Sequence, residues 1–265
     1  STDGLQENDL VLCLVSGGVL ALFTRPRDGV SLNDMQVLVG LLLESGASIE
    51  EINTIRKHLD QAKGGGFARL VQPAKVAALI LSDVVGSSMD IIASGPTVPD
   101  ISTFFETWEI LERYRLTDRI PNSVIEIIQQ GKLGQIPETP KSDDRCFNNV
   151  QNIIIADNRQ SALAALRAAH QKGFNAMFLS SFFQGEAKIV GQNMAGILKE
   201  VSISGNPVRR PACIVAGGET TVTISGDGFG GRNLETALGA VRDLAGLENV
   251  IFLSLATDGE DGPTD

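Results

Sequence analysis

Short apolar runs alternate with amphipathic segments along most of this chain. The apolar runs have the length of buried strands, and the segments between them repeat hydrophobic positions at the spacing of a helix face. The predicted strands cover residues 9–15, 76–81, 150–156, 176–180, 212–216, 221–225 and 250–255, and the predicted helices cover residues 104–114, 122–130, 159–171, 187–200 and 233–244. This alternation predicts an α/β fold with a mostly parallel sheet that is covered on both faces.

Two further helices are predicted from their start signals. Ser31 stands three residues before Asp34, and Ser48 stands three residues before Glu51, which is the spacing of a capping box. Gly46 follows the first of these helices and is expected to end it.

Polar stretches mark the expected loops and the expected domain boundary. Residues 131–149 are predicted to form a surface loop, and residues 205–210 are the best candidate for a linker. We therefore expect one domain over residues 1–205 and a second over residues 206–265. Residue 1 is not Met, and the chain stops directly after a glycine-rich loop, so we expect the first domain to lack an N-terminal part and the second to be truncated.

The composition disfavours several classes of function. The 265 residues carry a formal net charge of −10, which argues against a nucleic-acid binder because phosphate backbones attract basic surfaces. No apolar run is long enough to span a membrane. Cys13, Cys146 and Cys213 are widely spaced, so we expect reduced, buried thiols in a cytoplasmic protein. The chain has only two histidines, so a catalytic triad or zinc site built from histidines is not expected, and His58 is predicted to lie on a helix surface.

Three glycine-rich segments follow predicted strands. They are Ser16-Gly17-Gly18, residues 217–221 and residues 257–262. Glycine permits positive φ and close backbone approach, so successive N–H groups can form an anion-binding nest. Ligands of open α/β sheets bind beyond the carboxyl ends of the strands, where these segments stand. Together they predict a site for an anionic, phosphorylated substrate with a metal ion.

A further glycine cluster leads into the helix predicted over residues 233–244. In Gly230-Gly231-Arg232-Asn233, bare N–H groups at a helix N-terminus would favour phosphate, and Arg232 would add a cation for transferring phosphoryl oxygens. A glycine-rich turn with a solvent-exposed arginine fits the spacing about equally well. Residues 226–231 also match the dinucleotide-binding pattern, which is a weak signal in a chain with 28 glycines.

Carboxylates beside the glycines are candidates for metal binding or for a general base. Asp258 and Asp261 lie in the last glycine-rich segment, Asp83 follows a predicted strand, and Glu219 follows two glycines. Oxygen ligands of this kind suit Mg²⁺, and a carboxylate can accept the proton of an attacking hydroxyl. Tight Asp-Gly turns and helix caps are common alternative uses of such residues.

A basic pair stands on or just after the helix that Ser48 caps. Arg56 and Lys63 are seven residues apart and share one face if that helix continues far enough. Lys63 precedes three glycines, from where a lysine can reach a phosphate. The alternative is a solvated basic face, which is the commoner arrangement.

A series of multi-residue motifs runs in order over nearly the whole chain. The motifs are Ser16-Gly17-Gly18, Asn53-x-x-Arg56, Lys63-Gly64-Gly65, Ser82-Asp83-Val84-Val85-Gly86, Ser94-Gly95-Pro96-Thr97-Val98, Gly217-Gly218-Glu219-Thr220-Thr221-Val222, Gly230-Gly231-Arg232-Asn233 and Thr257-Asp258-Gly259-x-Asp261-Gly262-Pro263-Thr264. This set closely resembles class II glycerate kinases, the family with a C-terminal MOFRL domain.

The resemblance implies two Rossmann-like α/β domains with mostly parallel sheets and an active site in the cleft between the domains. It implies phosphorylation of D-glycerate by ATP with Mg²⁺, usually at the 2-hydroxyl, and a homodimer is one assembly that it allows. Arg232 and Asp258 correspond to catalytically important residues of the family. The resemblance further implies substrate or phosphate binding by Ser16, Gly17, Gly18, Arg56, Lys63, Gly230, Gly231, Asn233 and Glu219, and metal binding by Asp83 and Asp261.

The chain departs from the family pattern at several motif positions. Val19 and Leu20 follow Ser16-Gly17-Gly18 where the family usually has Gly and Ser, Ser87 stands for an aspartate, and Leu234 for a glutamine. These changes leave open a non-catalytic relative that binds a small anion, and the weak dinucleotide match leaves open a dehydrogenase of hydroxypyruvate. The family's Gly-Lys-Ala motif, which carries a catalytic lysine, has no counterpart in these residues.

Overall fold

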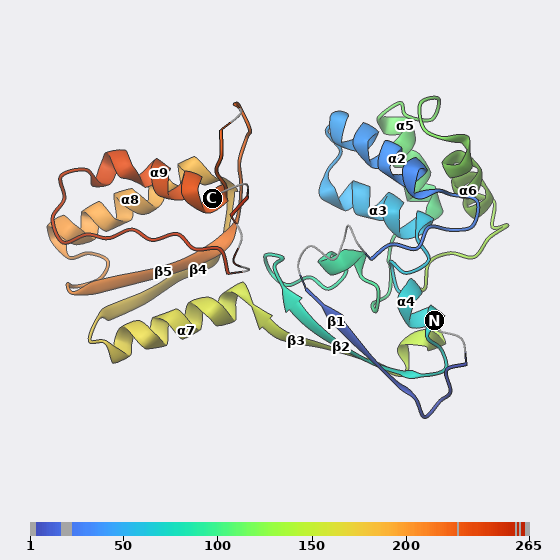
Figure 1. Cartoon of the computed structure of the whole chain (residues 1–265), viewed down its shortest axis with the longest axis horizontal. Helices are drawn as coiled ribbons and strands as arrows, with labels where there is room; N and C mark the ends of the chain where they lie inside the picture. The colour runs from blue at the N-terminus through green and yellow to red at the C-terminus, as the bar shows by residue number, and fades with distance from the viewer. Residues whose placement is uncertain (1–3, 17–22, 227, 258, 260, 263–265) are drawn as a thin grey trace. The chain divides into compact units, whose positions relative to one another are not determined.

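The computed structural model describes residues 4–16, 23–226, 228–257, 259, 261 and 262. The chain forms two compact units, each with its own strands and helices (Figure 1). Unit 1 consists of Ser1–Ser82 and Ser87–Ile155, and unit 2 consists of Asp83–Gly86 and Ala156–Asp265. Each unit combines helices with parallel strand pairing, so the predicted α/β class is confirmed.

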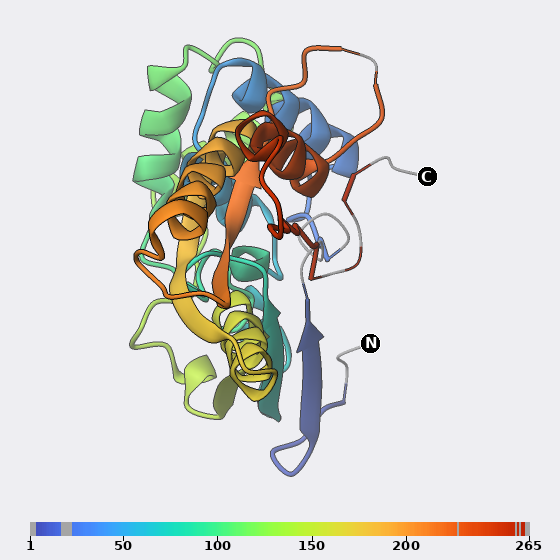
Figure 2. The same ribbon diagram turned by 90° about the vertical axis from the view of Figure 1, so that its left-hand side faces the viewer.

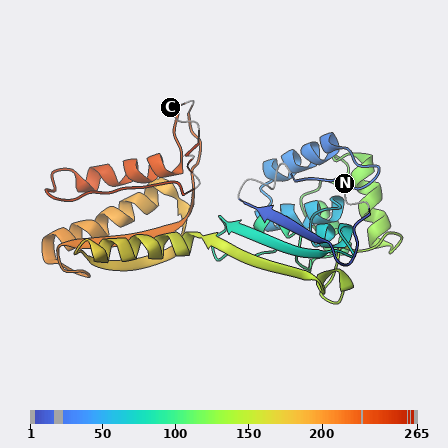
Figure 3. The same ribbon diagram turned by 60° about the horizontal axis from the view of Figure 1, so that its bottom comes forward.

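Unit 1 contains a three-stranded sheet. Strand β1 (Leu10–Val15) pairs in parallel with β2 (Lys75–Ser82), and β3 (Val150–Asp157) lies on the other side of β2. Figure 3 shows the three strands side by side, with the helices of unit 1 above them. Figure 2 shows β1 beside β2 at the edge of the sheet.

Among the residues that the structure describes, unit 1 also contains five helices and two short turns. They are α2 (Leu32–Glu44), α3 (Ile49–Leu59), α4 (Gly66–Leu70), α5 (Phe104–Arg113) and α6 (Asn122–Lys132), with 3-10 turns η1 (Ile92–Ser94) and η2 (Arg145–Phe147). Both predicted capping boxes are present, since the hydroxyls of Ser31 and Ser48 accept hydrogen bonds from the backbone N–H groups of Asp34 and Glu51. The sequence pattern does not predict α4, which is one short turn that begins among glycines.

An apolar core joins the helices of unit 1. Its buried side chains are Val30, Met35, Leu38, Leu42, Ile52, Ile55, Leu59, Ile110, Leu111, Leu116, Ile120, Val124 and Ile128. Complete burial of a leucine or isoleucine contributes about 1.5–3 kcal/mol. Isolated helices of this length are marginal in water, so this packing, more than helix propensity, stabilises α2, α3, α5 and α6.

The outer face of β1 corrects one prediction. Leu10, Leu12 and Leu14 are 65%, 56% and 69% exposed, whereas Val76 and Ile80 on the opposite face of β2 are buried. The described residues of unit 1 therefore cover one face of the sheet at β1, and not both. Alternation along a short apolar strand does not reveal which segments lie over each face.

Unit 2 is a two-stranded parallel sheet between helices. Strands β4 (Asn175–Glu186) and β5 (Ala212–Thr221) pair in parallel, and α7 (Asn158–Gln171) packs against both strands. Figure 1 shows α8 (Ala187–Ser204) on the opposite face, with α9 (Arg232–Leu244) lying along α8. The predicted boundary at residues 205 and 206 falls inside this unit, because α7, β4 and α8 pack with β5 and α9. It stays a prediction about the domains of the complete protein.

Two glycines let α8 and α9 approach closely. A side-chain carbon on Gly191 would collide with the carbonyl oxygen of Thr236, and one on Gly239 would collide with the carbonyl oxygen of Lys188. Gly196, also on α8, faces open space. The close crossing of the two helices therefore depends on Gly191 and Gly239 and not on glycine content in general.

Some predicted elements differ from the structure. The strands predicted over residues 212–216 and 221–225 are replaced by the single strand β5, which continues through Gly217 and Gly218 to Thr221. Residues 250–255 are not assigned as a strand, and Ile251, Leu253 and Leu255 are at least 70% exposed. A ladder needs a partner strand, and the apolar pattern of one segment cannot supply it.

Two predictions about environment also need correction. Residues 131–149 do not lie wholly on the surface, because Thr139 is buried and η2 falls within them. Of the cysteines only Cys146 is buried, and Cys13 and Cys213 are partly exposed; all three are free thiols. Burial, followed by a hydrogen bond to Asp144, raises the pKa of Cys146 to about 12. Within the described part of the chain, no helix is both long and apolar enough to cross a membrane.

Candidate active site

The N-terminus of α9 in unit 2 is occupied by a carboxylate of the chain itself. Asp261 Oδ1 accepts hydrogen bonds from the backbone N–H of Asn233 at 2.7 Å and from its side-chain amide at 3.0 Å, and Oδ2 accepts one from the N–H of Leu234 at 2.8 Å. Burial alone would raise the pKa of Asp261, but these hydrogen bonds and the charge of Arg232 lower it below its usual value. Two backbone amides of the first turn of α9, those of Asn233 and Leu234, therefore already bind Asp261.

Glycine is required where the two glycine-rich segments of unit 2 meet. A side-chain carbon on Gly231 would collide with the backbone of Asp261, and one on Gly262 would lie 2.7 Å from the carbonyl oxygen of Gly230. Gly262 also has a positive φ of 76°. The segment around Asp261 therefore packs directly against Gly230 and Gly231.

Arg232 forms an ion pair with Glu219 at the surface of unit 2. The contact joins Arg232 Nη1 to Glu219 Oε1, and the two side chains are 45% and 44% exposed. Asn233, the next residue, accepts a hydrogen bond from the Ser254 hydroxyl at 2.6 Å. The structure thus brings together six of the predicted residues of this unit, which are Glu219, Gly230, Gly231, Arg232, Asn233 and Asp261.

Gly217 and Gly218 serve strand packing and do not form the predicted ligand loop. A side-chain carbon on Gly217 would collide with the side chain of Asn158 at the start of α7, and one on Gly218 would collide with the backbone of Phe183 on β4. These glycines allow β5 to lie close to its neighbours. Because β5 continues through these glycines, Glu219 lies on the same strand and reaches Arg232.

The basic pair of unit 1 is brought together by a turn and not by a continued helix. Helix α3 ends at Leu59, and Asp60 has an extended backbone with φ −122° and ψ 130°. Lys63 is 1% exposed, and its ammonium donates a hydrogen bond to the carbonyl oxygen of Phe23 at 2.8 Å. Burial lowers the pKa of Lys63 to about 8; the negative charge of Asp60 opposes this shift, and the charge of Arg56 adds to it. The alternative of a solvated basic face is therefore wrong for Lys63.

Asp60 fixes the turn that holds Lys63. Its carboxylate accepts hydrogen bonds from the backbone N–H groups of Arg25 at 3.1 Å and Ala62 at 2.8 Å. Pro26 forms an isolated bridge with Asp60, so the segment that follows the first glycine-rich motif is tied to the end of α3. The Asp60 carboxylate thus lies close enough to Arg56 and Lys63 for its negative charge to act on both cations.

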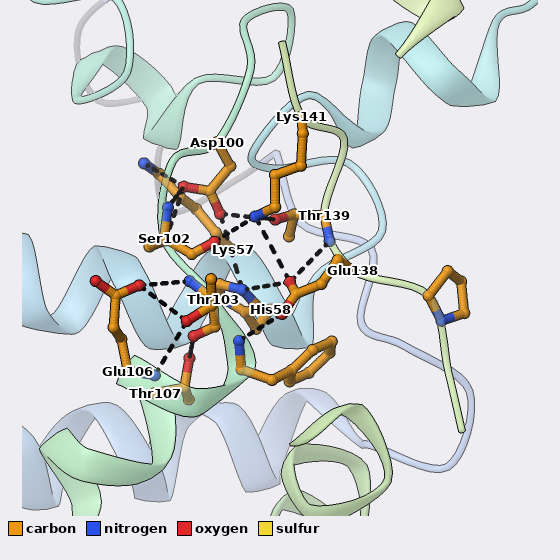
Figure 4. Close-up of polar contacts among 12 residues, drawn as sticks. Lys57, His58, Asp100, Ser102, Thr103, Glu106, Thr107, Glu138, Thr139 and Lys141 are labelled. Atoms are coloured by element: carbon orange, nitrogen blue, oxygen red, sulfur yellow. Dashed lines mark hydrogen bonds and ion pairs between the residues drawn. The ribbon is translucent and has the colours of Figure 1, made fainter. Parts of the chain in front are cut away.

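Figure 4 shows a network of polar contacts in unit 1 that includes Lys57, His58 and Asp100. Asp100 accepts hydrogen bonds from Lys57 at 3.4 Å, from the Ser102 hydroxyl at 2.7 Å and from the Thr139 hydroxyl at 3.0 Å. The side chain of Asp100 is fully buried, and a side-chain carbon on Gly64 would lie 3.3 Å from its Cβ. The network therefore supports the turn that follows Lys63.

His58 belongs to this network and is not a surface residue. It is 0% exposed, with Nδ1 2.7 Å from the carbonyl oxygen of Thr54 and Nε2 3.1 Å from Glu138. Both ring nitrogens therefore lie within hydrogen-bond distance of an oxygen atom. Burial alone would raise the pKa of Glu138, but hydrogen bonds from His58 and from the N–H of Phe104, and the charges of His58 and Lys141, lower it to about 2.

The predicted metal ligands differ in their surroundings. Asp83 is exposed after β2, whereas both carboxylate oxygens of Asp261 accept N–H groups. Among the residues that the structure describes, no group of three His, Cys, Asp or Glu side chains could hold a metal ion. Mg²⁺ in phosphoryl-transfer sites is usually bound by one or two carboxylates and by substrate phosphates, so Asp83 fits this chemistry and Asp261 does not.

Several residues of the predicted site fall in segments next to the described elements. Gly17, Gly18 and Asp258 lie outside the described residues, as do Val19 and Leu20. Ser16 is exposed directly after β1, and Ser87 has a positive φ of 53°. The predicted cleft between two domains stays a prediction.

Sequence reasoning missed several residues that shape the turn around Lys63 and the buried network of unit 1. Asp60, Asp100 and Glu138 are polar residues in turns or loops, and their partners are far away in the sequence. Asn53 and Ser94 stand inside motifs of the resemblance but received no role. A buried polar residue within a conspicuous motif is the signal that could have found them.

Models of two families match parts of this chain. A model of the MOFRL family matches residues 212–265, and a model described as "Domain of unknown function (DUF4147)" matches residues 1–129. The chain is 47% identical over 263 residues to D-glycerate 2-kinase of Thermotoga maritima, a match that covers 99% of this chain and 60% of that protein. It is 38% identical over 304 residues to glycerate kinase of Macaca fascicularis, with 99% and 75% covered.

Solved structures agree with these matches. The crystal structure of glycerate kinase from Thermotoga maritima gives a TM-score of 0.88 at 47% identity, and the match covers 100% of this chain and 61% of that one. A crystal structure of a protein from Pyrococcus horikoshii gives 0.81 at 44% identity, with 100% and 60% covered. This chain thus spans 60% of the length of the Thermotoga relative. On the identity and extent of these matches, the chain belongs to the glycerate kinase family.

Proposed function

We propose that the complete protein transfers the γ-phosphoryl group of ATP to the 2-hydroxyl of D-glycerate. The observation that carries this proposal is Arg232, a guanidinium at the start of α9 that Glu219 holds beside the Gly230-Gly231 turn. Relatives at 45–47% identity that are named D-glycerate 2-kinase and glycerate 2-kinase support the substrate and the position of transfer.

Arg232 has the chemistry to stabilise a transferring phosphoryl group. Its guanidinium is planar, stays charged, and can donate two hydrogen bonds to phosphoryl oxygens. Because Arg232 and Glu219 are each nearly half exposed, water or an anion can reach the pair. We propose that the side chain of Arg232, and not the helix amides that Asp261 occupies, binds the phosphate in unit 2.

The proposed reaction needs a base for the attacking hydroxyl. The 2-hydroxyl oxygen bonds to the γ-phosphorus, the bond from that phosphorus to the bridging oxygen breaks, and ADP leaves. We assign the released proton to the carboxylate of Asp258, on the basis of the Thr-Asp-Gly motif. Asp83 would hold Mg²⁺ together with phosphate oxygens of the nucleotide, and the ion would neutralise phosphate charge during transfer.

Lys63 and Arg56 would supply positive charge from unit 1. The pKa of Lys63 is about 8, so a growing share of Lys63 becomes neutral as the pH rises through that value. The affinity for an anionic ligand that depends on this charge should then fall above about pH 8. A titration of substrate affinity against pH, in parallel with Lys63→Arg, would test this role, because arginine stays charged over this range.

The hydroxypyruvate dehydrogenase alternative lacks support at the residues that suggested it. A dinucleotide pyrophosphate would need the free N–H groups at the start of α9, and the Asp261 carboxylate that binds there would repel it. A dehydrogenase predicts oxidation of NADH by hydroxypyruvate without ATP, which the full-length protein should not show.

The decisive experiment measures phosphorylation by the full-length protein. ATP, Mg²⁺ and D-glycerate should give 2-phosphoglycerate, which ³¹P NMR separates from the 3-phosphate. Arg232→Ala should lower kcat by about 10²–10³-fold, the usual cost of losing one stabilising donor. Arg242→Ala, an exposed arginine in the last turn of the same helix, is the matched control and should retain activity. Equal activity of the two variants, or no product from the wild type, would reject the proposal.

A further inference from the structure

Helix α3 carries a buried amide with an unused donor. Asn53 is 3% exposed, and its Oδ1 accepts a hydrogen bond from the Ser94 hydroxyl at 3.0 Å. Its Nδ2 is buried and has no hydrogen-bond partner among the residues that the structure describes. Buried polar groups are nearly always paired, so an amide left in this state indicates a missing acceptor.

The partner of Asn53 is held by an unusual backbone. Ala93, Ser94 and Gly95 have φ values of 52°, 58° and 62°, which place three successive residues in the left-handed region. Only glycine adopts this region without strain, and such strain persists where surrounding structure imposes it, often at ligand sites. One of the strained residues, Ser94, is the residue whose hydroxyl orients the Asn53 amide.

Hydrogen bonds tie this strained turn to the glycine-rich turn after Lys63. The N–H of Gly64 donates to the carbonyl oxygen of Ser94 at 2.9 Å, and the N–H of Gly65 donates to that of Gly95 at 2.7 Å. The two motifs that the sequence shows separately, Lys63-Gly64-Gly65 and Ser94-Gly95-Pro96, are therefore one structural unit. Asn53 is linked to it through Ser94.

A cation follows the Asn53 amide by about one turn of α3. Arg56 lies three residues after Asn53 on α3, so the two side chains share one helix face. Arg56 is half-buried, and it is close enough to Lys63 for their charges to interact. A donor for which the described residues supply no acceptor, one helical turn from a cation, is suited to an anion with several acceptor oxygens.

We propose that Asn53 is a substrate-binding residue whose Nδ2 donates a hydrogen bond to the carboxylate of the small hydroxy acid, with Arg56 as the neighbouring cation. This proposal rests on the proposed function for the identity of the acid, D-glycerate. The assignment of a carboxylate as the ligand rests on the Asn53 donor and the neighbouring Arg56. The Asn53 side chain is almost inaccessible to solvent, which fits a small ligand better than a nucleoside triphosphate. Ser94 would be a positioning residue that fixes the direction of the amide.

Asn53→Asp in the full-length protein tests this directly. The substitution keeps the shape and the Oδ1 acceptor but replaces the donor by a charge that repels a carboxylate. The KM for D-glycerate should rise by about 10- to 100-fold, the scale of a lost buried hydrogen bond, while the KM for ATP stays unchanged. An unchanged KM for D-glycerate, or a rise in the KM for ATP alone, would overturn the proposal.

Two further measurements separate this proposal from a structural role and from the kinase proposal. Ser94→Ala leaves the Asn53 donor in place and should raise the KM for D-glycerate less than Asn53→Asp does, with kcat retained. Where Asn53→Asp does not fold, as judged by circular dichroism, Asn53→Ser replaces it with the same expectation.

Calorimetric titration with D-glycerate without nucleotide needs no turnover: binding that Asn53→Asp abolishes supports the site even if no product forms. Binding that the variant retains overturns it.

Discussion

The charged groups of unit 1 and unit 2 are held in opposite ways. In unit 1, Lys57 and Asp100 are buried and joined by a hydrogen bond, and Asp100 accepts further hydrogen bonds from hydroxyl groups. Arg232 and Glu219 in unit 2, in contrast, form one pair that is nearly half exposed. A buried charge loses its hydration and must be fully paired, while water screens an exposed pair. The buried charges of unit 1 therefore stabilise a backbone turn, whereas the exposed charges of unit 2 are free to reorient toward a ligand.

The largest expected effect comes from breaking the buried network of unit 1. Asp100→Ala removes the acceptor of Lys57, Ser102 and Thr139 and should lower the free energy of unfolding by about 3–5 kcal/mol, because it leaves buried donors unpaired. Urea unfolding measures this. Asp118→Ala, an exposed aspartate of the same unit, is the control and should change stability little. Equal losses in the two variants would show that the network does not stabilise unit 1.

A smaller effect is expected from the packing of the helix pair in unit 2. Gly191→Ala forces a side-chain carbon against the carbonyl oxygen of Thr236 and should destabilise the protein by about 1–3 kcal/mol. Gly196→Ala on the same helix meets open space and should stabilise it by about 0.5–1 kcal/mol, since alanine favours helix. Thermal unfolding should move in opposite directions for the two variants. A shift in the same direction would contradict the close crossing of α8 and α9.

Acid should weaken the network of unit 1 through Glu138. Its folded pKa of about 2 lies below the ordinary value of 4.5, so its contribution is present above about pH 4.5 and is lost as the pH falls toward 2. Because a third of the side chain is exposed, we expect only about 1–2 kcal/mol. Unfolding free energies between neutral pH and pH 3 should fall less steeply in Glu138→Gln than in the wild type. Glu126→Gln, an exposed glutamate on α6, should follow the wild type.

The smallest expected effect is on the exposed pair of unit 2. A double-mutant cycle of Arg232→Ala and Glu219→Ala should give a coupling to stability of at most about 1 kcal/mol, and salt should reduce it further. A stable protein that loses turnover with Arg232→Ala would sharpen the comparison between the units. A coupling as large as the Asp100 effect would instead show that this pair is structural.

Local chemistry let the sequence alone determine much of the fold. The capping boxes at Ser31 and Ser48 join groups three residues apart, and the apolar spacing that follows each of them repeats within one or two turns. Predictions of this kind hold because all their partners lie on the same short segment. The motifs likewise placed Arg232 beside glycines at the start of a helix, and the structure confirms that position.

Only the tertiary structure decided how distant groups meet. Nothing local indicates that His58 is buried against Glu138, or that Lys63 reaches the carbonyl oxygen of Phe23. Asp261 binds the amides of α9 from 28 residues away, and the strand expected over residues 250–255 does not form. The physical reason is the same in each case: burial, capping and strand pairing depend on partners that folding brings together, and a hydrophobic pattern records only that a residue needs a partner, not which one.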